Sequence, residues 1–246
     1  MHIFYDIADT VTAFTAGKGC HGTEPGVDAR EVGILSVASD SIFIPRQTHS
    51  LNVVWADGPG EAPNSDAVIT RKRGLCVAVK TADCIPVLLY DECQQLVAAV
   101  HAGWRGTVGR IVSRTIEEMQ SRGEDLYAVI GPGISLGSFE VGDEVYDTFR
   151  EAGFPMERIA KRYPTTQNSP LFALHSELST TLNSTHSTLH SKWHLDLWDA
   201  NRWLLEQAGV KRIHIDGTDT MTSADFYSAR RDTIKTGRNI NGIMLR

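Results

Sequence analysis

The sequence has few cysteines, no long apolar run and no excess of positive charge, and each shortage excludes a class of protein. Its 246 residues include four cysteines and no CxxC pair, which argues against a disulfide-rich secreted scaffold and favours a reducing cytoplasm. No stretch approaches the roughly 20 apolar residues of a membrane-spanning helix, and residues 1–10 lack the pattern of a signal peptide. The net charge of -6 argues against a nucleic-acid partner, which normally requires a clustered basic face.

Strands and helices are expected to alternate along the chain without an internal repeat or linker. Runs rich in Val, Leu and Ile, separated by turn residues, predict strands, and apolar residues at helical spacing predict helices. This mixture predicts one α/β domain over residues 1–246, with mixed α+β sheets and flanking helices. Segment 155–191 is rich in Ser, Thr, Asn and Pro, and we expect a lid or a variable insertion there. The expected strands are 66–70, 74–84, 85–91, 95–102, 125–134, 212–217 and 240–245, and the expected helices are 108–123, 138–153 and 195–209.

The stretch "VLLYDECQQLVAAVHAGWRGT" (87–107) predicts a hairpin that ends in polar residues. If residues 91–94 form its turn, Cys84 lies directly opposite His101, and opposed Cβ atoms on antiparallel strands are about 4.5–5.5 Å apart. That separation suits two ligands of one zinc ion. His49, in the polar loop "IPRQTHS", is the best candidate for a third ligand. A buried cysteine is more often a small hydrophobe, so the pattern alone leaves a structural interpretation open.

A second group of histidines offers a competing metal pattern. His186, His190 and His194 are spaced by four residues, which would align them on one face of a helix. The surrounding Ser and Thr residues are poor helix formers. We therefore expect a polar loop or strand in this segment.

The stretch "WRGT" (104–107) precedes a helix that is expected to begin near Val108. Free N–H groups at a helix start favour an anion such as phosphate, and Arg105 can add bidentate contacts. Gly106 and Thr107 would then contact the anion, although Thr107 is equally well explained as a helix N-cap. Further candidates for positive charge near a site are Arg46, Arg230 and Arg231, the last two of which can instead pair with Asp232.

Several motifs together resemble one known family. "QTHS", "DAVIT", "TADCIPVLL", "AAVHAGWRGT", "GPGIS" with "FEVGDEV", "DLWDANRWLLEQAGV" and "FYSARRDTIKTGR" resemble the YfiH-like family. Its members are also called polyphenol oxidoreductase laccase-domain proteins and purine nucleoside phosphorylases. The resemblance runs from about Ile44 to the C-terminus. The chain departs from the family in its short segment "FTAGKGCHGTEPG", in Asp219-Thr220 where Cys-Thr is common, and in Phe139 where Tyr is common.

The resemblance implies a single α/β domain similar to the cysteine-hydrolase fold of cytotoxic necrotizing factor. It also implies that His49, Cys84 and His101 bind zinc and form the catalytic centre. Three protein ligands leave a fourth position for water or substrate, as in catalytic zinc sites. Copper can occupy such ligands in vitro because it outcompetes zinc at most of them.

The family's activities imply a nucleoside and phosphate as small-molecule partners. They are the phosphorolysis of adenosine, inosine and methylthioadenosine, and the deamination of adenosine. Asp83 and Glu140 are candidate proton shuttles, with strand-end solvation and helix capping as their alternative roles. The protein is expected to be a monomer or homodimer.

Three alternatives remain open from the sequence. In the first, Cys84 is a nucleophile and His101 its base, in an amidase that edits cytoplasmic peptidoglycan precursors. The second is a copper-dependent polyphenol oxidase. The third is a non-enzymatic scaffold with a structural zinc ion.

Overall fold

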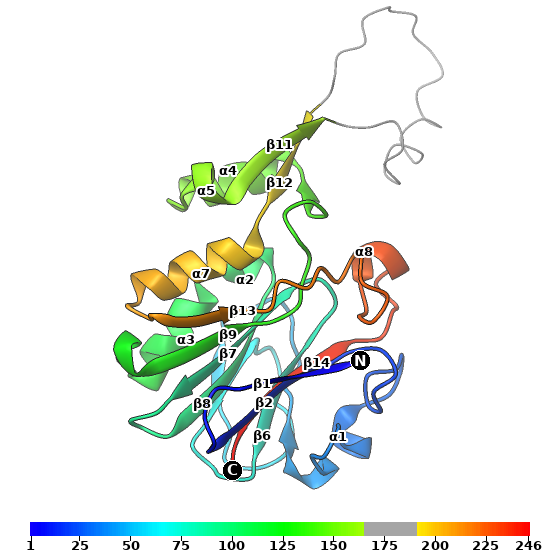
Figure 1. Ribbon diagram of the computed structural model, residues 1–246, viewed down its shortest axis with the longest axis vertical. Helices are drawn as coiled ribbons and strands as arrows, with labels where there is room; N and C mark the ends of the chain where they lie inside the picture. Colours follow the sequence, from blue (N-terminus) through cyan, green and yellow to red (C-terminus); the bar gives the residue numbers. More distant parts are fainter. Residues whose placement is uncertain (165–190) are drawn as a thin grey trace, which may run out of the picture.

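Two large β-sheets stacked face to face form the centre of the computed structural model, which describes residues 1–164 and 191–246 (Figure 1). Helices cover the outer face of the larger sheet, and the segment that contains α1 lies by the smaller one. The predicted mixed α/β fold is confirmed. None of the described helices is long and apolar enough to cross a membrane.

The smaller sheet has five strands, and the last strand of the chain lies at its middle. Strand β14 pairs with β2 on one side and with β6 on the other, both antiparallel. The chain therefore brings its two ends and its middle together in this sheet. The strand order is β1 (His2–Tyr5), β2 (Val11–Ala16), β14 (Asn239–Leu245), β6 (Cys76–Thr81) and β3 (Ile42–Phe43).

The larger sheet has six strands, and the predicted hairpin is at its centre. Side chains alternate across β7: Leu88 packs toward the five-stranded sheet, whereas Leu89 packs toward the helices. Since both faces are covered, the hairpin strands read as almost continuous apolar runs. The strand order is β13 (Arg212–Ile215), β9 (Leu126–Ile130), β7 (Ile85–Asp91), β8 (Leu96–Ala102), β5 (Ala67–Thr70) and β4 (Val53–Trp55).

A third, three-stranded sheet and the helices complete the described fold. The small sheet has the order β10 (Glu140–Val141), β12 (Ser191–Leu195) and β11 (Ala160–Pro164). The helices are α1 (Ala29–Val32), α2 (Trp104–Val108), α3 (Ile111–Met119), α4 (Asp143–Glu151), α5 (Met156–Ile159), α7 (Leu197–Gln207) and α8 (Ala229–Asp232), with 3₁₀ turns at Ser39–Ser41 and Gly123–Asp125. Of the segment expected to be a lid or insertion, residues 165–190 lie outside the described residues.

The predicted register of the hairpin was wrong by two positions. His101 pairs with Pro86, not with Cys84, because the strand continues through Asp91 before the chain turns. The Asp91 carboxylate accepts the N–H groups of Cys93 and Gln94 at 2.9 and 2.8 Å, which starts the turn one residue later than expected. A shift of two positions keeps every side chain on its own face. Cys84 and His101 therefore still share one face, as diagonal neighbours.

The helix after the hairpin also begins earlier than predicted. Gly103 is the N-cap of α2, so Thr107 lies within the helix and its N–H donates to the Gly103 carbonyl at 2.8 Å. The longer helix α3 follows after Arg110, whose left-handed conformation (φ 61°) separates the two. The prediction that Thr107 caps a helix beginning near Val108 was wrong, because the helix begins at Trp104 and Gly103 occupies the N-cap position without a side-chain hydrogen bond.

We expect Leu88→Ala to lower the free energy of unfolding by about 2–5 kcal/mol, because it leaves a cavity between the two sheets. Leu88 is buried in the apolar layer that they share. Urea denaturation measures the change, with Val32→Ala on the exposed side of α1 as a control expected to stay within about 0.5 kcal/mol. Equal effects of the two substitutions would contradict the assigned packing.

Candidate metal centre

Two histidines and a cysteine from separate parts of the chain converge at one end of the six-stranded sheet. One ligand atom from each of His49, Cys84 and His101 lies within 4.8 Å of the others. The Cys84 Sγ is 3.9 Å from the His49 Nε2, and the two imidazole rings are 4.9 Å apart at an angle of 70°. The three predicted ligands therefore form one cluster.

The backbone around Cys84 turns sharply to place the thiol at the start of β7. Asp83 has a left-handed conformation (φ 87°), which is rare for a residue with a side chain. This bend separates the end of β6 from the start of β7. Strained backbone of this kind concentrates at functional sites.

Gly103 leaves the space in which the three ligands meet. Extending the hairpin register by one step places Gly103 opposite Cys84. A Cβ atom on Gly103 would lie 2.9 Å from the Cys84 Sγ and 3.1 Å from the His49 Cδ2. The backbone angles of Gly103 (φ -67°) are open to any residue, so the absence of a side chain serves the site and not the local conformation.

A buried carboxylate holds both histidines. The Asp66 Oδ1 lies 2.7 Å from the His101 Nδ1. The same carboxylate accepts the N–H groups of Thr48, His49 and Ser50 at 3.1, 3.1 and 2.7 Å, and the Ser50 hydroxyl at 2.8 Å. Because Asp66 occupies the His101 Nδ1, the Nε2 atom of that ring is left for a metal ion.

The surroundings favour charged forms in the cluster. Burial alone would raise the pKa of Asp66, but hydrogen bonds from His101, Ser50 and Thr48 outweigh it and lower that pKa to about 2. Burial would likewise raise the pKa of Cys84, but the charge of His101 and hydrogen bonds from both histidines lower it to about 6. A deprotonated thiol is the form that binds a metal ion.

The cluster opens into a cleft of about 610 Å³. Its walls come from loop 22–27, the His49 loop, the end of β6 and segment 234–240 near the C-terminus. This volume is within the range of small-molecule sites. The cleft thus joins a metal-ligand set to space for a substrate.

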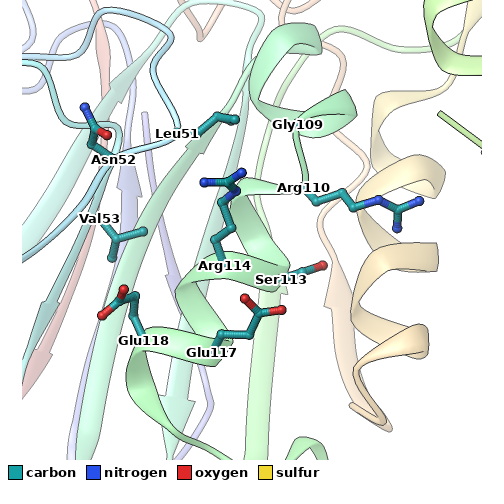
Figure 2. Close-up of a pocket in the computed structure, with 9 residues that line it drawn as sticks. All are labelled: Leu51, Asn52, Val53, Gly109, Arg110, Ser113, Arg114, Glu117 and Glu118. Atoms are coloured by element: carbon teal, nitrogen blue, oxygen red, sulfur yellow. The ribbon is translucent and has the colours of Figure 1, made fainter.

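Figure 2 shows a second groove of about 550 Å³, between residues 51–53 and helix α3. Its lining includes Arg114, Glu117 and Glu118, whereas the Arg110 guanidinium points away to the Ala152 carbonyl and the Trp203 ring. The groove contains no cysteine or histidine. It is therefore a surface feature apart from the metal centre.

Asp83 holds the wall of the cleft instead of facing the three ligands. Its carboxylate accepts the Thr220 hydroxyl at 2.8 Å and the Arg230 N–H at 2.7 Å. Both oxygens are engaged, so the structure places this candidate proton shuttle in a positioning contact. Glu140 lies in β10 and is not among the residues that line the cleft.

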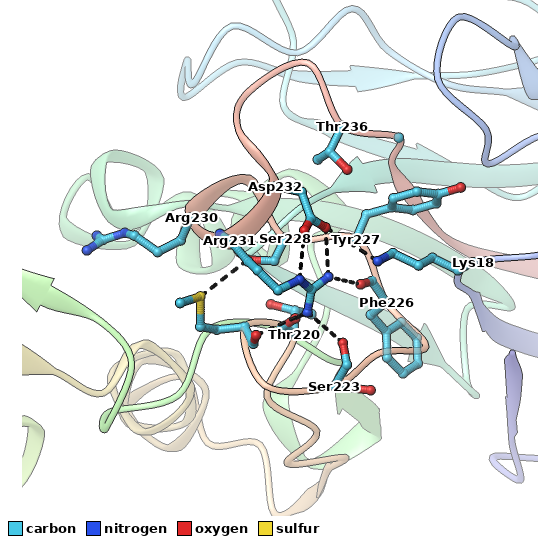
Figure 3. Close-up of polar contacts among 12 residues, drawn as sticks. Lys18, Thr220, Ser223, Phe226, Tyr227, Ser228, Arg230, Arg231, Asp232 and Thr236 are labelled. Carbon is cyan, nitrogen blue, oxygen red and sulfur yellow. Dashed lines mark hydrogen bonds and ion pairs between the residues drawn. The ribbon is translucent and has the colours of Figure 1, made fainter. Parts of the chain in front are cut away.

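Arg231 closes the neighbouring loop, as Figure 3 shows. Its guanidinium donates to the carbonyl groups of Thr220, Met221, Ser223 and Phe226 and pairs with the carboxylate of Asp232. With these contacts made, Arg231 stabilises the loop and the adjoining helix α8, whose Ala229 lines the cleft.

The structure separates the residues that were expected to bind phosphate. Arg46 lines the cleft and pairs with Glu61, whereas exposed Arg105 stacks on Trp104, 4.3 Å from its ring. The Thr107 side chain is buried and accepts a hydrogen bond from Asn201 at 3.0 Å. Gly106 is also buried, so Gly106 and Thr107 pack α2 against α7, and phosphate binding at "WRGT" stays a prediction.

The competing histidine group was expected in a polar loop or strand. His186 and His190 lie outside the described residues. His194 is in β12, and its Nδ1 lies 3.0 Å from the Leu136 carbonyl.

Asp66, which holds both candidate histidine ligands, was not predicted from the sequence. One feature of the sequence does point to it: Asp66 comes directly before the apolar run "AVIT", and a carboxylate at the start of a buried strand needs hydrogen-bond partners. The partners themselves come from residues 48–50 and from β8, which are distant in sequence.

We expect Asp66→Asn to weaken the binding of Zn²⁺ by about 10–100-fold, since it removes the charge that orients His101 and the His49 loop. Competition against a chelating dye measures the affinity. Exposed Asp9 provides the matched control, Asp9→Asn. An Asp66→Asn protein that binds Zn²⁺ as tightly as the control would contradict this role.

Gly103→Ala is expected to weaken Zn²⁺ binding at least tenfold, because the added methyl group occupies the space between Cys84 and His49. Gly58→Ala, where an added Cβ meets nothing within 4 Å, is the control for a change of glycine alone. The same competition assay applies, and thermal unfolding of the metal-free proteins separates crowding of the ligands from loss of fold. Undiminished affinity in Gly103→Ala would show that the ligands meet elsewhere.

Comparisons with known proteins agree with the fold and the motifs. The family described as multi-copper polyphenol oxidoreductase laccase matches residues 28–246. A purine nucleoside phosphorylase of Bacteroides thetaiotaomicron is 38% identical over 228 residues, which cover 86% of this chain and 76% of the relative. The adenosine deaminase RL5 of an unknown prokaryotic organism is 36% identical over 225 residues, with coverage of 85% and 77%.

A solved structure gives the same result for the fold. YlmD from Geobacillus stearothermophilus superposes with a TM-score of 0.74 at 25% identity, covering 100% of both chains. The curated relatives are named as enzymes, and the matches span most of this chain. The chain is therefore an enzyme that belongs to the multi-copper polyphenol oxidoreductase laccase family, the YfiH-like proteins that its motifs resemble.

Proposed function

We propose that this enzyme is a zinc-dependent purine nucleoside phosphorylase that acts on adenosine, inosine and methylthioadenosine and also deaminates adenosine. The observation that carries the proposal is the cluster of His49, Cys84 and His101 at one end of a substrate-sized cleft. The names of the two relatives, a phosphorylase and a deaminase, support both activities.

The donor atoms fit zinc. Two imidazole nitrogens and one thiolate are ligands that zinc accepts, and three protein ligands are typical of catalytic sites. The space kept free at Gly103 and the lowered pKa of Cys84 agree with a bound cation. A zinc ion held there would supply Lewis-acid chemistry at neutral pH.

The protein's own residues prepare the site for this chemistry. Asp66 fixes the orientation of the His101 ring through Nδ1 and holds the His49 loop through three N–H groups. Asp83 fixes the opposite wall through Thr220 and Arg230. These contacts hold the candidate ligands and the wall of the cleft in place before a substrate binds, which is how preorganised sites lower a barrier.

Cys84→Ala is expected to lower adenosine turnover at least 1,000-fold while leaving the fold intact, because the half-buried thiol belongs to the ligand cluster. The assay follows adenine and inosine by chromatography, with and without phosphate, on protein of known zinc content. Adenine that forms only with phosphate is the product of phosphorolysis, whereas inosine is the product of deamination. Cys93→Ala, at an exposed position of the hairpin turn, is the matched control, and a fully active Cys84→Ala enzyme would disprove the proposal.

A second candidate function rests on the same residues. In this candidate, Cys84 would be the nucleophile, His101 its base and Asp66 the acid that orients the base, as in Cys–His hydrolases. Such an enzyme would be an amidase, as expected for the editing of cytoplasmic peptidoglycan precursors. It predicts that metal-free protein hydrolyses an amide substrate and forms a trapped acyl adduct on Cys84, whereas the zinc enzyme requires the metal.

The two remaining alternatives receive less support. Among residues 1–164 and 191–246, the cluster has three members, fewer than the four ligands of a structural zinc site. A multicopper oxidase needs several copper sites, and copper bound to these three ligands would reflect its high affinity for nitrogen and sulfur donors. The cytoplasmic location and the monomeric or homodimeric state remain predictions.

A further inference from the structure

The cleft has a charge opposite to that of the whole chain. The protein has a net charge of -6, yet four basic side chains line the cleft and only one acidic side chain does. A low-dielectric cleft of one sign concentrates ligands of the other sign. The basic residues are Arg46, Lys80, Lys235 and Arg238, and the acidic residue is Glu24.

Three of the four basic groups have other partners or face solvent. Arg46 pairs with Glu61. Arg238 donates to the carbonyl groups of its own loop, at residues 234, 236 and 237. Lys235 is exposed at the rim. These contacts shape the cleft. Lys80 is the remaining basic side chain, and it supplies the positive charge inside the cleft.

Lys80 is half-buried and is held at a fixed place relative to the metal ligands. It pairs with Ile240 across β6 and β14, and both residues line the cleft. Its backbone N–H donates to the Gln47 Oε1 at 2.7 Å, and its carbonyl accepts from the Gln47 Nε2 at 2.8 Å. Since Gln47 is two residues before His49, this pair of hydrogen bonds ties Lys80 to the loop that carries a metal ligand.

Among the residues that the structure describes, Lys80 makes hydrogen bonds through its backbone, and its ammonium group makes no hydrogen bond or ion pair. Burial lowers its pKa, with the charges of Asp28 and Glu61 acting against burial and those of Arg30 and Arg238 acting with it. Removing a charged amine from water without a partner is costly. An anion in the cleft would offset that cost.

We propose that Lys80 is the group in this cleft that binds phosphate. This inference rests on the proposed function, because phosphorolysis requires a phosphate ion next to the substrate. Phosphorolysis takes place at C1′ of the ribose, whereas deamination takes place at C6 of the base. The two reactions therefore need separate subsites in one cleft, and Lys80 supplies the first of them.

The assignment is an alternative to the anion site that the sequence predicted at "WRGT". There, Thr107 is hydrogen-bonded to Asn201 and Gly106 is packed beneath Ile111. Lys80 is instead accessible from the cleft, and it was missed because a single lysine in a strand has no distinctive sequence pattern.

Deamination, which consumes no phosphate, is the internal control for the test. Lys80→Gln is expected to raise the KM for phosphate in adenosine phosphorolysis at least tenfold and to leave kcat/KM for phosphate-free deamination within twofold. Lys80→Arg should restore most of the phosphate affinity, because it restores the charge. Lys211→Gln, an exposed lysine outside the cleft, should change neither reaction. An unchanged KM for phosphate in Lys80→Gln, or an equal loss of both reactions, would overturn the proposal.

A binding measurement separates this inference from the proposed function. Inorganic phosphate should raise the Tm of the wild-type zinc enzyme at constant ionic strength, and this rise should be lost in Lys80→Gln. This rise in Tm is expected even if the enzyme forms no adenine. The absence of adenine would disprove phosphorolysis but not phosphate binding by Lys80. An equal rise in both proteins would overturn the role of Lys80.

The phosphate group could also belong to a nucleotide substrate, and adenosine 5′-monophosphate is the probe for that source. If the site binds inorganic phosphate, Lys80→Gln weakens phosphate binding and leaves the deamination of adenosine 5′-monophosphate at its wild-type rate. Selective loss of nucleotide deamination, with phosphate binding intact, would overturn the assignment to free phosphate.

Discussion

The buried carboxylate of Asp66 is the constraint on which the candidate metal centre depends. It is fully buried, so its charge must be met by partners within the protein, and removing one partner of a buried ionic group costs about 3–5 kcal/mol. The partners are the His101 ring and the N–H groups of residues 48–50. Satisfying this one carboxylate therefore brings together a loop and a strand that are far apart in the sequence, and each of them carries a candidate metal ligand, His49 or His101.

The stacked sheets explain why the ligands meet where they do. Cys84 and His101 project from one face of the six-stranded sheet, the face that packs on the five-stranded sheet. Along most of the strands this face is filled by apolar side chains. At the end of the sheets, loop 22–27 and segment 234–240 cover the opening incompletely and leave the cleft. The apolar layer thus excludes water from one side of the cluster and leaves the other side open to a substrate.

The walls of the cleft are held by contacts made outside it. Asp83 links the start of β7 to Thr220 and Arg230, and Arg231 closes the next loop through four carbonyl groups. Both residues carry charge near the site, and in both the charged group is engaged in hydrogen bonds that hold the fold. Proximity to a metal ligand in sequence is thus a poor guide to a chemical role, because each charged group must first satisfy its own partners.

The sequence by itself determined the strands of the hairpin, the shared face of Cys84 and His101 and, through the family's motifs, the candidate third ligand His49. Alternation along a strand is a local property, and it survived a register error of two positions because that shift is even. Only the tertiary structure decided the positions of Asp66, Gly103 and Lys80 and the burial of Thr107. These depend on contacts between segments far apart in the chain, where one residue's burial or free space is set by another's packing. No local pattern encodes such contacts.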